Sequence, residues 1–84
     1  MTEKEFMVEK MYEKHKVWQL PMGKAAKEWG SSASAVNKLF GGAKALPEKT
    51  IKDQNIIPEW KMVGKRKKWP LANIADWVLN TQNV

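Results

Sequence analysis

Side chains that could carry out catalysis are scarce in this 84-residue chain, which has no cysteine and one histidine, His15. Disulfides, thiolate zinc sites and cysteine nucleophiles are therefore excluded, and one imidazole cannot build a histidine metal cluster or a proton relay. The acidic residues lack metal-loop spacing, and Gly41-Gly42 is not followed by a phosphate-loop pattern. We therefore expect a protein that is not an enzyme and that needs no metal, cofactor or small-molecule ligand.

Basic side chains are the abundant polar type. Fifteen Lys and Arg residues against nine Asp and Glu residues give a net charge of +6. Five of the cations lie within residues 61–68, which contain no acid. A concentrated basic stretch in a small domain favours binding to a polyanion, but a solvated turn is an equally good interpretation of charge alone.

A second indication of function comes from the spacing of small and aliphatic residues around Gly30. Ala26 lies four positions before this glycine and Val36 lies six positions after it. Two helices that cross through a short turn need a small side chain where their backbones approach and a glycine where the chain reverses. The spacing predicts a helix-turn-helix over residues 21–41, with a generic helical hairpin as the alternative.

The outer face of the second helix would present short polar side chains, an amide and a cation. Asparagine can bond adenine through two hydrogen bonds, lysine can reach guanine or phosphate, and small residues let a helix lie deep in the major groove. The predicted base-reading residues are Ser32, Ser34, Asn37 and Lys38. The predicted phosphate contacts are Lys24 and Lys27 on the preceding helix and Lys65, Arg66, Lys67 and Lys68 in the basic run.

Other elements must position these side chains. Apolar periodicity predicts an N-terminal helix over residues 2–16, capped by Thr2, and a closing helix over residues 71–80. Between them, Pro47 could begin one or two helical turns that end near Gln54. His15 is expected to be a structural residue near the end of the first helix.

A β-hairpin is predicted over residues 60–69, with strands at 60–63 and 68–69 and a turn at 64–67. Met62, Val63 and Trp69 are expected to be buried, and Pro70 should end the pairing because it has no N–H to donate. Trp29, Trp60 and Trp69 are expected in the core, whereas Trp18 and Trp77 are candidates for partner contacts.

The order of these elements is that of a winged helix, with the basic hairpin as the wing. The predicted fold is mostly α with a small β-hairpin (α+β), forming a single winged helix-turn-helix domain over residues 1–84. Two stretches read LPMGKAAKEWGSSASAVNKLF and IIPEWKMVGKRKKWPLANIADWVL, with Met11-Tyr12 before them. Together they resemble the MerR-type winged helices of excisionases and small prophage regulators, most closely the pyocin-activator type. Residues 43–57 depart from that family because they are longer and more polar than its usual link.

The resemblance implies DNA binding by residues 32–38 and by the wing. We interpret the chain as a small protein that binds double-stranded DNA, a transcriptional regulator of a phage or mobile element. A homodimer or a cooperative oligomer on DNA is expected, because one module of this size buries little surface. An excisionase that bends DNA is one alternative, and a protein-interaction module such as an antirepressor or inhibitor is another. The chain shows no signal-peptide pattern and no transmembrane-length apolar run, so we expect a cytoplasmic protein without a membrane partner.

Overall fold

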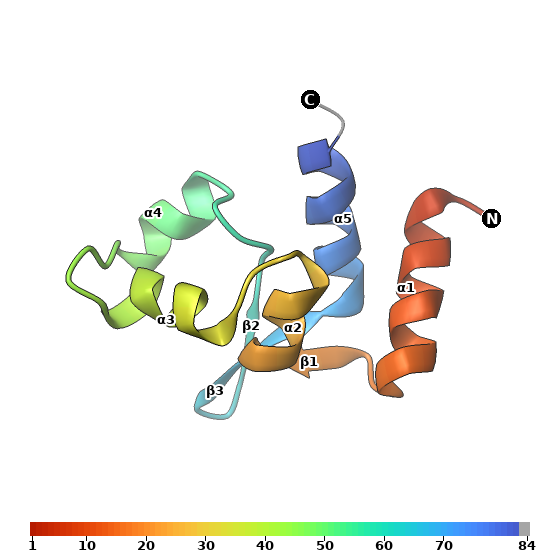
Figure 1. Ribbon diagram of the computed structural model, residues 1–84, viewed down its shortest axis with the longest axis horizontal. Helices are drawn as coiled ribbons and strands as arrows, with labels where there is room; N and C mark the ends of the chain where they lie inside the picture. Colours follow the sequence, from red (N-terminus) through yellow and green to blue (C-terminus); the bar gives the residue numbers. More distant parts are fainter. Residues whose placement is uncertain (83–84) are drawn as a thin grey trace.

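Five helices and a three-stranded antiparallel sheet form an α+β fold in the computed structural model, which describes residues 1–82 (Figure 1). The predicted α+β class is confirmed. Helix α1 stands at one end of the longest axis and α3 and α4 at the other, with α2, α5 and the sheet between them (Figure 1). In chain order the elements are α1 (Glu3–His15), β1 (Gln19–Pro21), α2 (Met22–Glu28), α3 (Ala33–Gly41), α4 (Glu48–Asp53), β2 (Lys61–Val63), β3 (Arg66–Pro70) and α5 (Leu71–Gln82).

The helix ends follow the predicted caps closely. Thr2 is the N-cap of α1, and its hydroxyl accepts a hydrogen bond from the Glu5 amide at 3.1 Å. Lys16 ends that helix in the left-handed conformation. Helix α1 therefore covers residues 3–15, one residue shorter at each end than the predicted 2–16, because Thr2 and Lys16 are its caps. Helix α4 confirms the helical turns predicted after Pro47, and α5 extends two residues beyond the predicted end at residue 80.

The junction between α2 and α3 has the glycine turn and the serine cap that the sequence predicted. Gly30 has a φ of +82°, a conformation that glycine adopts without a side-chain penalty. The Ser31 amide donates to the Ala26 carbonyl at 2.8 Å, and the Ser32 hydroxyl caps α3 by accepting from the Ala35 amide at 3.2 Å. Both predicted packing residues, Ala26 and Val36, are buried, so the two helices share one core.

The sheet contains one strand more than the predicted hairpin. Its order is β1-β3-β2, so β3 is central, and Leu20 lies opposite Trp69 while Gln19 lies opposite Pro70. The prediction that pairing ends at Pro70 is confirmed, because the β2–β3 pairs stop at Lys68 and the last β1–β3 pair is Gln19 with Pro70. This proline is the last residue of β3, where the missing N–H costs the ladder little.

The β2–β3 turn is shorter than predicted. Only two residues, Gly64 and Lys65, separate the strands, and Gly64 takes a positive φ of +64° that suits a two-residue hairpin turn. Arg66 and Lys67 therefore belong to strand β3 and not to the turn, which corrects the predicted turn at 64–67, whereas Lys68 lies in the strand as predicted.

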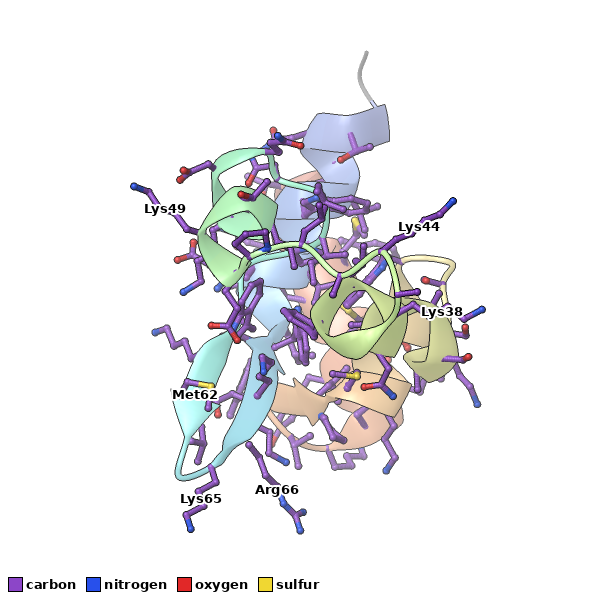
Figure 2. All side chains as sticks on the ribbon, turned by 90° about the vertical axis from the view of Figure 1, so that its left-hand side faces the viewer. Lys38, Lys44, Lys49, Met62, Lys65 and Arg66 are labelled. Carbon is purple, nitrogen blue, oxygen red and sulfur yellow. The ribbon has the colours of Figure 1, made fainter. Side chains whose placement is uncertain are left out.

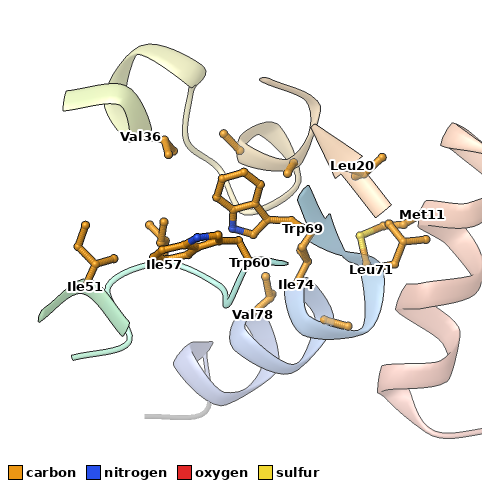
Figure 3. Packing of buried hydrophobic residues seen from close by; sticks show 13 residues of the cluster. Met11, Leu20, Val36, Ile51, Ile57, Trp60, Trp69, Leu71, Ile74 and Val78 are labelled. Atoms are coloured by element: carbon orange, nitrogen blue, oxygen red, sulfur yellow. The ribbon is translucent and has the colours of Figure 1, made fainter. Parts of the chain in front are cut away.

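A cluster of buried side chains drawn from the helices, β1, β3 and the link before β2 forms the core (Figure 3). Trp69 is fully buried, and its indole N–H donates to the Pro58 carbonyl at 2.9 Å. The Trp60 ring lies 6.1 Å from the Trp69 ring, and both tryptophans are in the core as predicted; Trp29, 5.9 Å from Trp69, is only partly buried against it. Trp18 is exposed and stacks on Tyr12.

Residues 61–68, which we call the hairpin arm, are the part of the sheet that the core does not cover. Met62 is 57% exposed and Val63 is 48% exposed, so the expected burial of both residues is wrong. The arm extends past the core, and no other element of residues 1–82 packs over its tip (Figures 1 and 2).

Candidate nucleic-acid interface

Acidic side chains are missing from two long stretches of the chain. Residues 29–47 and residues 60–75 contain no Asp or Glu. The first stretch includes all of α3, and the second includes the whole hairpin. The cations in these stretches are Lys38, Lys44, Lys61, Lys65, Arg66, Lys67 and Lys68. Four of the nine acids lie instead on α1, at the other end of the molecule.

Phe40, near the end of α3, joins the two acid-free stretches. Its ring meets the Trp60 ring edge to face, with 5.1 Å between the centroids. The ammonium nitrogen of Lys67 lies 4.6 Å from the centroid of the same ring. These contacts hold α3 beside the base of the hairpin. We call the combined face of residues 33–41 and 61–68 the α3–hairpin surface.

The predicted base-reading residues divide between two roles. Ser34, Asn37 and Lys38 are exposed and line an open hollow together with Phe40 and the glycines that follow. Ser32 is also exposed, but its hydroxyl is engaged as the cap of α3. The structure therefore gives Ser32 a structural task and leaves three side chains free to meet a partner.

Helix geometry places Asn37 and Lys38 on different sides of α3. Each residue of a helix advances by about 100°, so Asn37 lies roughly 60° around the axis from Phe40 and Lys38 roughly 160°. Because Phe40 points to the base of the hairpin, Asn37 lies on the hairpin side of α3. Lys38 projects from the opposite side (Figure 2).

Strand register distributes the hairpin cations over both faces of the arm. Lys61 lies opposite Lys68, and Val63 lies opposite Arg66. Directly opposed residues share a face, so Lys61, Arg66 and Lys68 form one basic face. Like charges directly opposite one another are destabilising, and this stretch supplies no acid to offset them. Lys65 and Arg66 extend into solvent at the tip (Figure 2).

Lys67 differs from the other hairpin cations. Its ammonium nitrogen lies 3.3 Å from a carboxylate oxygen of Glu48, and its side chain is only 24% exposed. It also lies over the Phe40 ring. Lys67, which the sequence predicted as a phosphate contact, is thus engaged by Glu48 and Phe40 and positions the hairpin against α3 and α4.

The two predicted lysines of α2 lie apart from one another. Lys24 is exposed two residues after Met22, which lines a shallow hollow with the hairpin residues Lys65 to Lys68. Lys27 lines a different hollow, together with Trp77 and Thr81 of α5. The structure therefore does not bring Lys27 to the α3–hairpin surface.

Four cations at this end of the molecule were not among the predicted site residues: Lys44, Lys49, Lys52 and Lys61. Lys44 lies in the link after α3, and Lys49 lies on α4; both extend into solvent (Figure 2). Lys44 could have been found from the absence of acids in residues 29–47. Lys49 could not have been found in this way, because Glu48 precedes it and it lies outside the acid-free stretch. Its place at this end of the molecule follows from the position of α4, which the sequence does not show.

The single histidine belongs to a different contact. His15 is 10% exposed, and its Nε2 lies 2.7 Å from a Glu28 carboxylate oxygen that Lys14 also contacts at 3.1 Å. Burial raises the pKa of the Glu28 carboxyl, but hydrogen bonds from His15 and Lys14 outweigh burial and leave that pKa below its ordinary value. The predicted structural role of His15 is confirmed, and the contact ties α1 to α2.

Within residues 1–82, no three acidic or histidine side chains gather closely enough to hold a metal ion. Among the same residues, no helix combines the length and the apolar character needed to cross a membrane. No protein-family model matches the chain, and comparison with curated proteins and with solved structures finds no match.

Proposed function

We propose that this protein is a winged helix-turn-helix protein that binds double-stranded DNA, with α3 as the recognition helix and the β2–β3 hairpin as the wing. The observation that carries the proposal is the packing of Phe40 against Trp60 and Lys67. This packing holds two acid-free, basic elements side by side, and a duplex offers a matching row of phosphates.

In this arrangement α3 enters the major groove, which is about 12 Å wide and admits a helix. Asn37 is the residue best suited to read a base, because its amide can pair with adenine through two hydrogen bonds. Ser34 supports it from the exposed face of the helix, and Lys38 contacts a phosphate or guanine from the far side.

The hairpin and its neighbours supply the contacts that hold the duplex in register. Lys65 and Arg66 at the tip, with Lys61 and Lys68 on the basic face, are placed to neutralise phosphates. Lys44 and Lys49 extend into solvent on the same side of the molecule (Figure 2). Lys67 acts indirectly, by fixing the angle between the hairpin and α3.

The role that agrees best with this chemistry and with the family resemblance is transcriptional regulation in a phage or mobile element, in the cytoplasm and without catalysis. One observation favours a second role as a protein-interaction module. Trp18 is 62% exposed and stacks on Tyr12 with 4.2 Å between ring centroids, close to α1 and away from the α3–hairpin surface. A protein partner bound there would leave the proposed DNA surface free.

The proposed function is tested by selecting bound duplexes from a pool of random sequence with the purified protein. We expect enrichment of a short shared site, protected from cleavage in a footprint that covers adjacent major and minor grooves. The same selection with an Asn37→Ala variant should lose the preference at one base pair. A wild-type protein that enriches no sequence and shows no salt-dependent binding to duplex DNA would contradict the proposal.

A further inference from the structure

The link between α1 and β1 presents two exposed apolar side chains beside a tyrosine of α1. Trp18 is 62% exposed and Val17 is 46% exposed, and the Trp18 ring stacks on Tyr12 with 23° between the ring planes. The Trp18 carbonyl accepts a hydrogen bond from the Leu71 amide at 2.9 Å, so both its backbone and its ring are held in place. We call Tyr12, Val17 and Trp18 the aromatic corner. A rigid, exposed tryptophan loses little conformational entropy when a partner covers it, and tryptophan is enriched among the residues that dominate binding energy at interfaces.

Charged side chains of opposite sign lie on either side of the aromatic corner along α1. Glu9 precedes Tyr12 by three positions and Lys16 follows it by four, so each lies about one helical turn from the tyrosine. Both side chains are exposed, and neither forms an ion pair within residues 1–82. Glu13, by contrast, pairs with Lys10 at 3.7 Å. The aromatic corner is therefore bordered by one unpaired acid and one unpaired cation.

A second copy of the chain carries the matching charges at the same spacing. A two-fold axis that crosses α1 at right angles beside the corner makes the two α1 helices antiparallel. It places the residue before Tyr12 in one copy opposite the residue after Tyr12 in the other, so Glu9 meets Lys16 twice. With parallel helices Glu9 would face Glu9, and the like charges would repel. Charge complementarity therefore favours a second copy in the antiparallel arrangement.

We propose that the aromatic corner is the centre of a two-fold dimer, in which Trp18 and Tyr12 of both copies pack together between two Glu9–Lys16 ion pairs. The link between α1 and β1 lies at the α1 end of the molecule, away from α3 (Figure 1). The dimer thus leaves the α3–hairpin surface of each copy uncovered, and two modules together supply contact area that one module of this size lacks on DNA. The dimer forms without DNA, so its test does not depend on the proposed function.

The first measurement is sedimentation equilibrium of the protein without DNA, over a wide range of protein concentration. The variant is Trp18→Ala, and the matched control is Phe6→Ala, which removes another exposed aromatic side chain about 120° around α1 from Tyr12. Wild type should show a reversible monomer–dimer equilibrium. Trp18→Ala should raise the dissociation constant of the dimer by at least about tenfold, whereas Phe6→Ala should change it by less than about twofold.

The second measurement reverses one charge at a time. Glu9→Lys places two lysines opposite each other at both ends of the interface, and Lys16→Glu does the same with two glutamates. Each variant alone should form a dimer roughly threefold to thirtyfold weaker than the wild type. An equimolar mixture of the two variants should associate as tightly as the wild type, because every pair between unlike copies then joins a lysine to a glutamate. Circular dichroism of each variant establishes that it is folded.

Three outcomes would overturn the proposal. A wild type that stays monomeric at every concentration would leave the aromatic corner to a different protein partner. Equal weakening by Trp18→Ala and Phe6→Ala would place the dimer interface elsewhere. A mixture of the two charge variants that stays monomeric, although the wild type dimerises, would contradict the antiparallel arrangement. None of these results would bear on DNA binding by the α3–hairpin surface, which the selection of duplexes tests separately.

Discussion

Lys67 of β3 and Glu48 of α4 form an ion pair, with 3.3 Å between the ammonium nitrogen and a carboxylate oxygen. The pair links the first residue of α4 to the hairpin. Because Lys67 also lies over Phe40, one side chain connects α3, α4 and β3. The contact sets the position of the hairpin and at the same time withdraws one cation from solvent.

Replacing Glu48 should therefore strengthen DNA binding. In Glu48→Gln the negative charge beside the surface is lost and Lys67 becomes available to a phosphate. We expect tighter binding at low salt and a slope of log affinity against log salt that is steeper by up to about 0.9. The free energy of unfolding should fall by no more than about 1 kcal/mol, because the Glu48 carboxylate is 57% exposed. Asp53→Asn, at the end of the same helix, is the control; equal affinity in both variants and wild type would contradict the prediction.

Asn37 and Lys38 should differ in what they contribute, because they project from different sides of α3. Asn37→Ala should weaken binding to the selected site by about 1–3 kcal/mol and relax the preference at one base pair. Lys38→Ala should weaken all sequences to a similar degree. Both side chains are exposed, so circular dichroism should be unchanged. Asn80→Ala, an exposed amide on α5, is the control. If both α3 variants bind as the wild type does, α3 does not read the DNA.

Gly30 should be far more sensitive to substitution than Gly41. A side chain at Gly30 would be forced into a positive φ, which costs roughly 1–2 kcal/mol for an L residue, although no atom lies within 4 Å of the added carbon. Gly41 also has open space but an ordinary helical conformation, so Gly41→Ala should leave stability unchanged or raise it by up to about 1 kcal/mol. Urea denaturation of both alanine variants measures the difference. Equal stability of the two would place the turn between α2 and α3 elsewhere.

The Glu28 contact predicts a stability difference that depends on pH. The folded state lowers the pKa of this carboxyl, so the ionised form stabilises the fold above the ordinary value of 4.5 and this contribution is lost as the pH falls through the folded-state pKa. Glu28→Gln should reduce the free energy of unfolding by about 1–2 kcal/mol at neutral pH and by progressively less in acid. Glu13→Gln, on the exposed face of α1, is the control. If the free energies of unfolding of Glu28→Gln and the wild type differed by the same amount throughout the acid range, the charge of Glu28 would not act through His15 and Lys14.

Features that depend on neighbouring residues could be predicted from the sequence. The cap at Thr2, the reversal at Gly30 and the cap at Ser32 each involve groups within a few positions along the chain. The same holds for the apolar faces of the helices, because a period of 3.6 residues is a local property. The exposure of Asn37 could be predicted in the same way, because Asn37 follows the core residue Val36 and so faces away from the core.

Features that depend on which segments lie side by side could not be predicted. Strand β1 joins the sheet because Leu20 pairs with Trp69, about fifty residues later, and the alternation in residues 17–20 is too short to show this. Exposure of Met62 was missed because an alternating strand does not tell whether a second layer covers it. The engagement of Lys67 was missed because Glu48 lies in a segment whose position the sequence pattern does not reveal.

The most direct test of DNA binding by the α3–hairpin surface compares two triple variants that each lose three positive charges. One carries Lys65→Gln, Arg66→Gln and Lys68→Gln on the hairpin, and the other carries Lys10→Gln, Lys14→Gln and Lys16→Gln at the α1 end. Circular dichroism of both establishes that they are folded. The measurement is the affinity for one duplex over a range of salt concentrations, for both variants and the wild type.

The hairpin variant should show a slope of log affinity against log salt that is flatter by about two to three, because each lost phosphate contact removes roughly 0.9. Binding to unrelated sequences should weaken to the same degree. The α1 variant should keep the slope of the wild type, since its lysines lie at the other end of the molecule. A folded hairpin variant with an unchanged slope, or equal flattening in both variants, would contradict the proposal that this surface binds DNA.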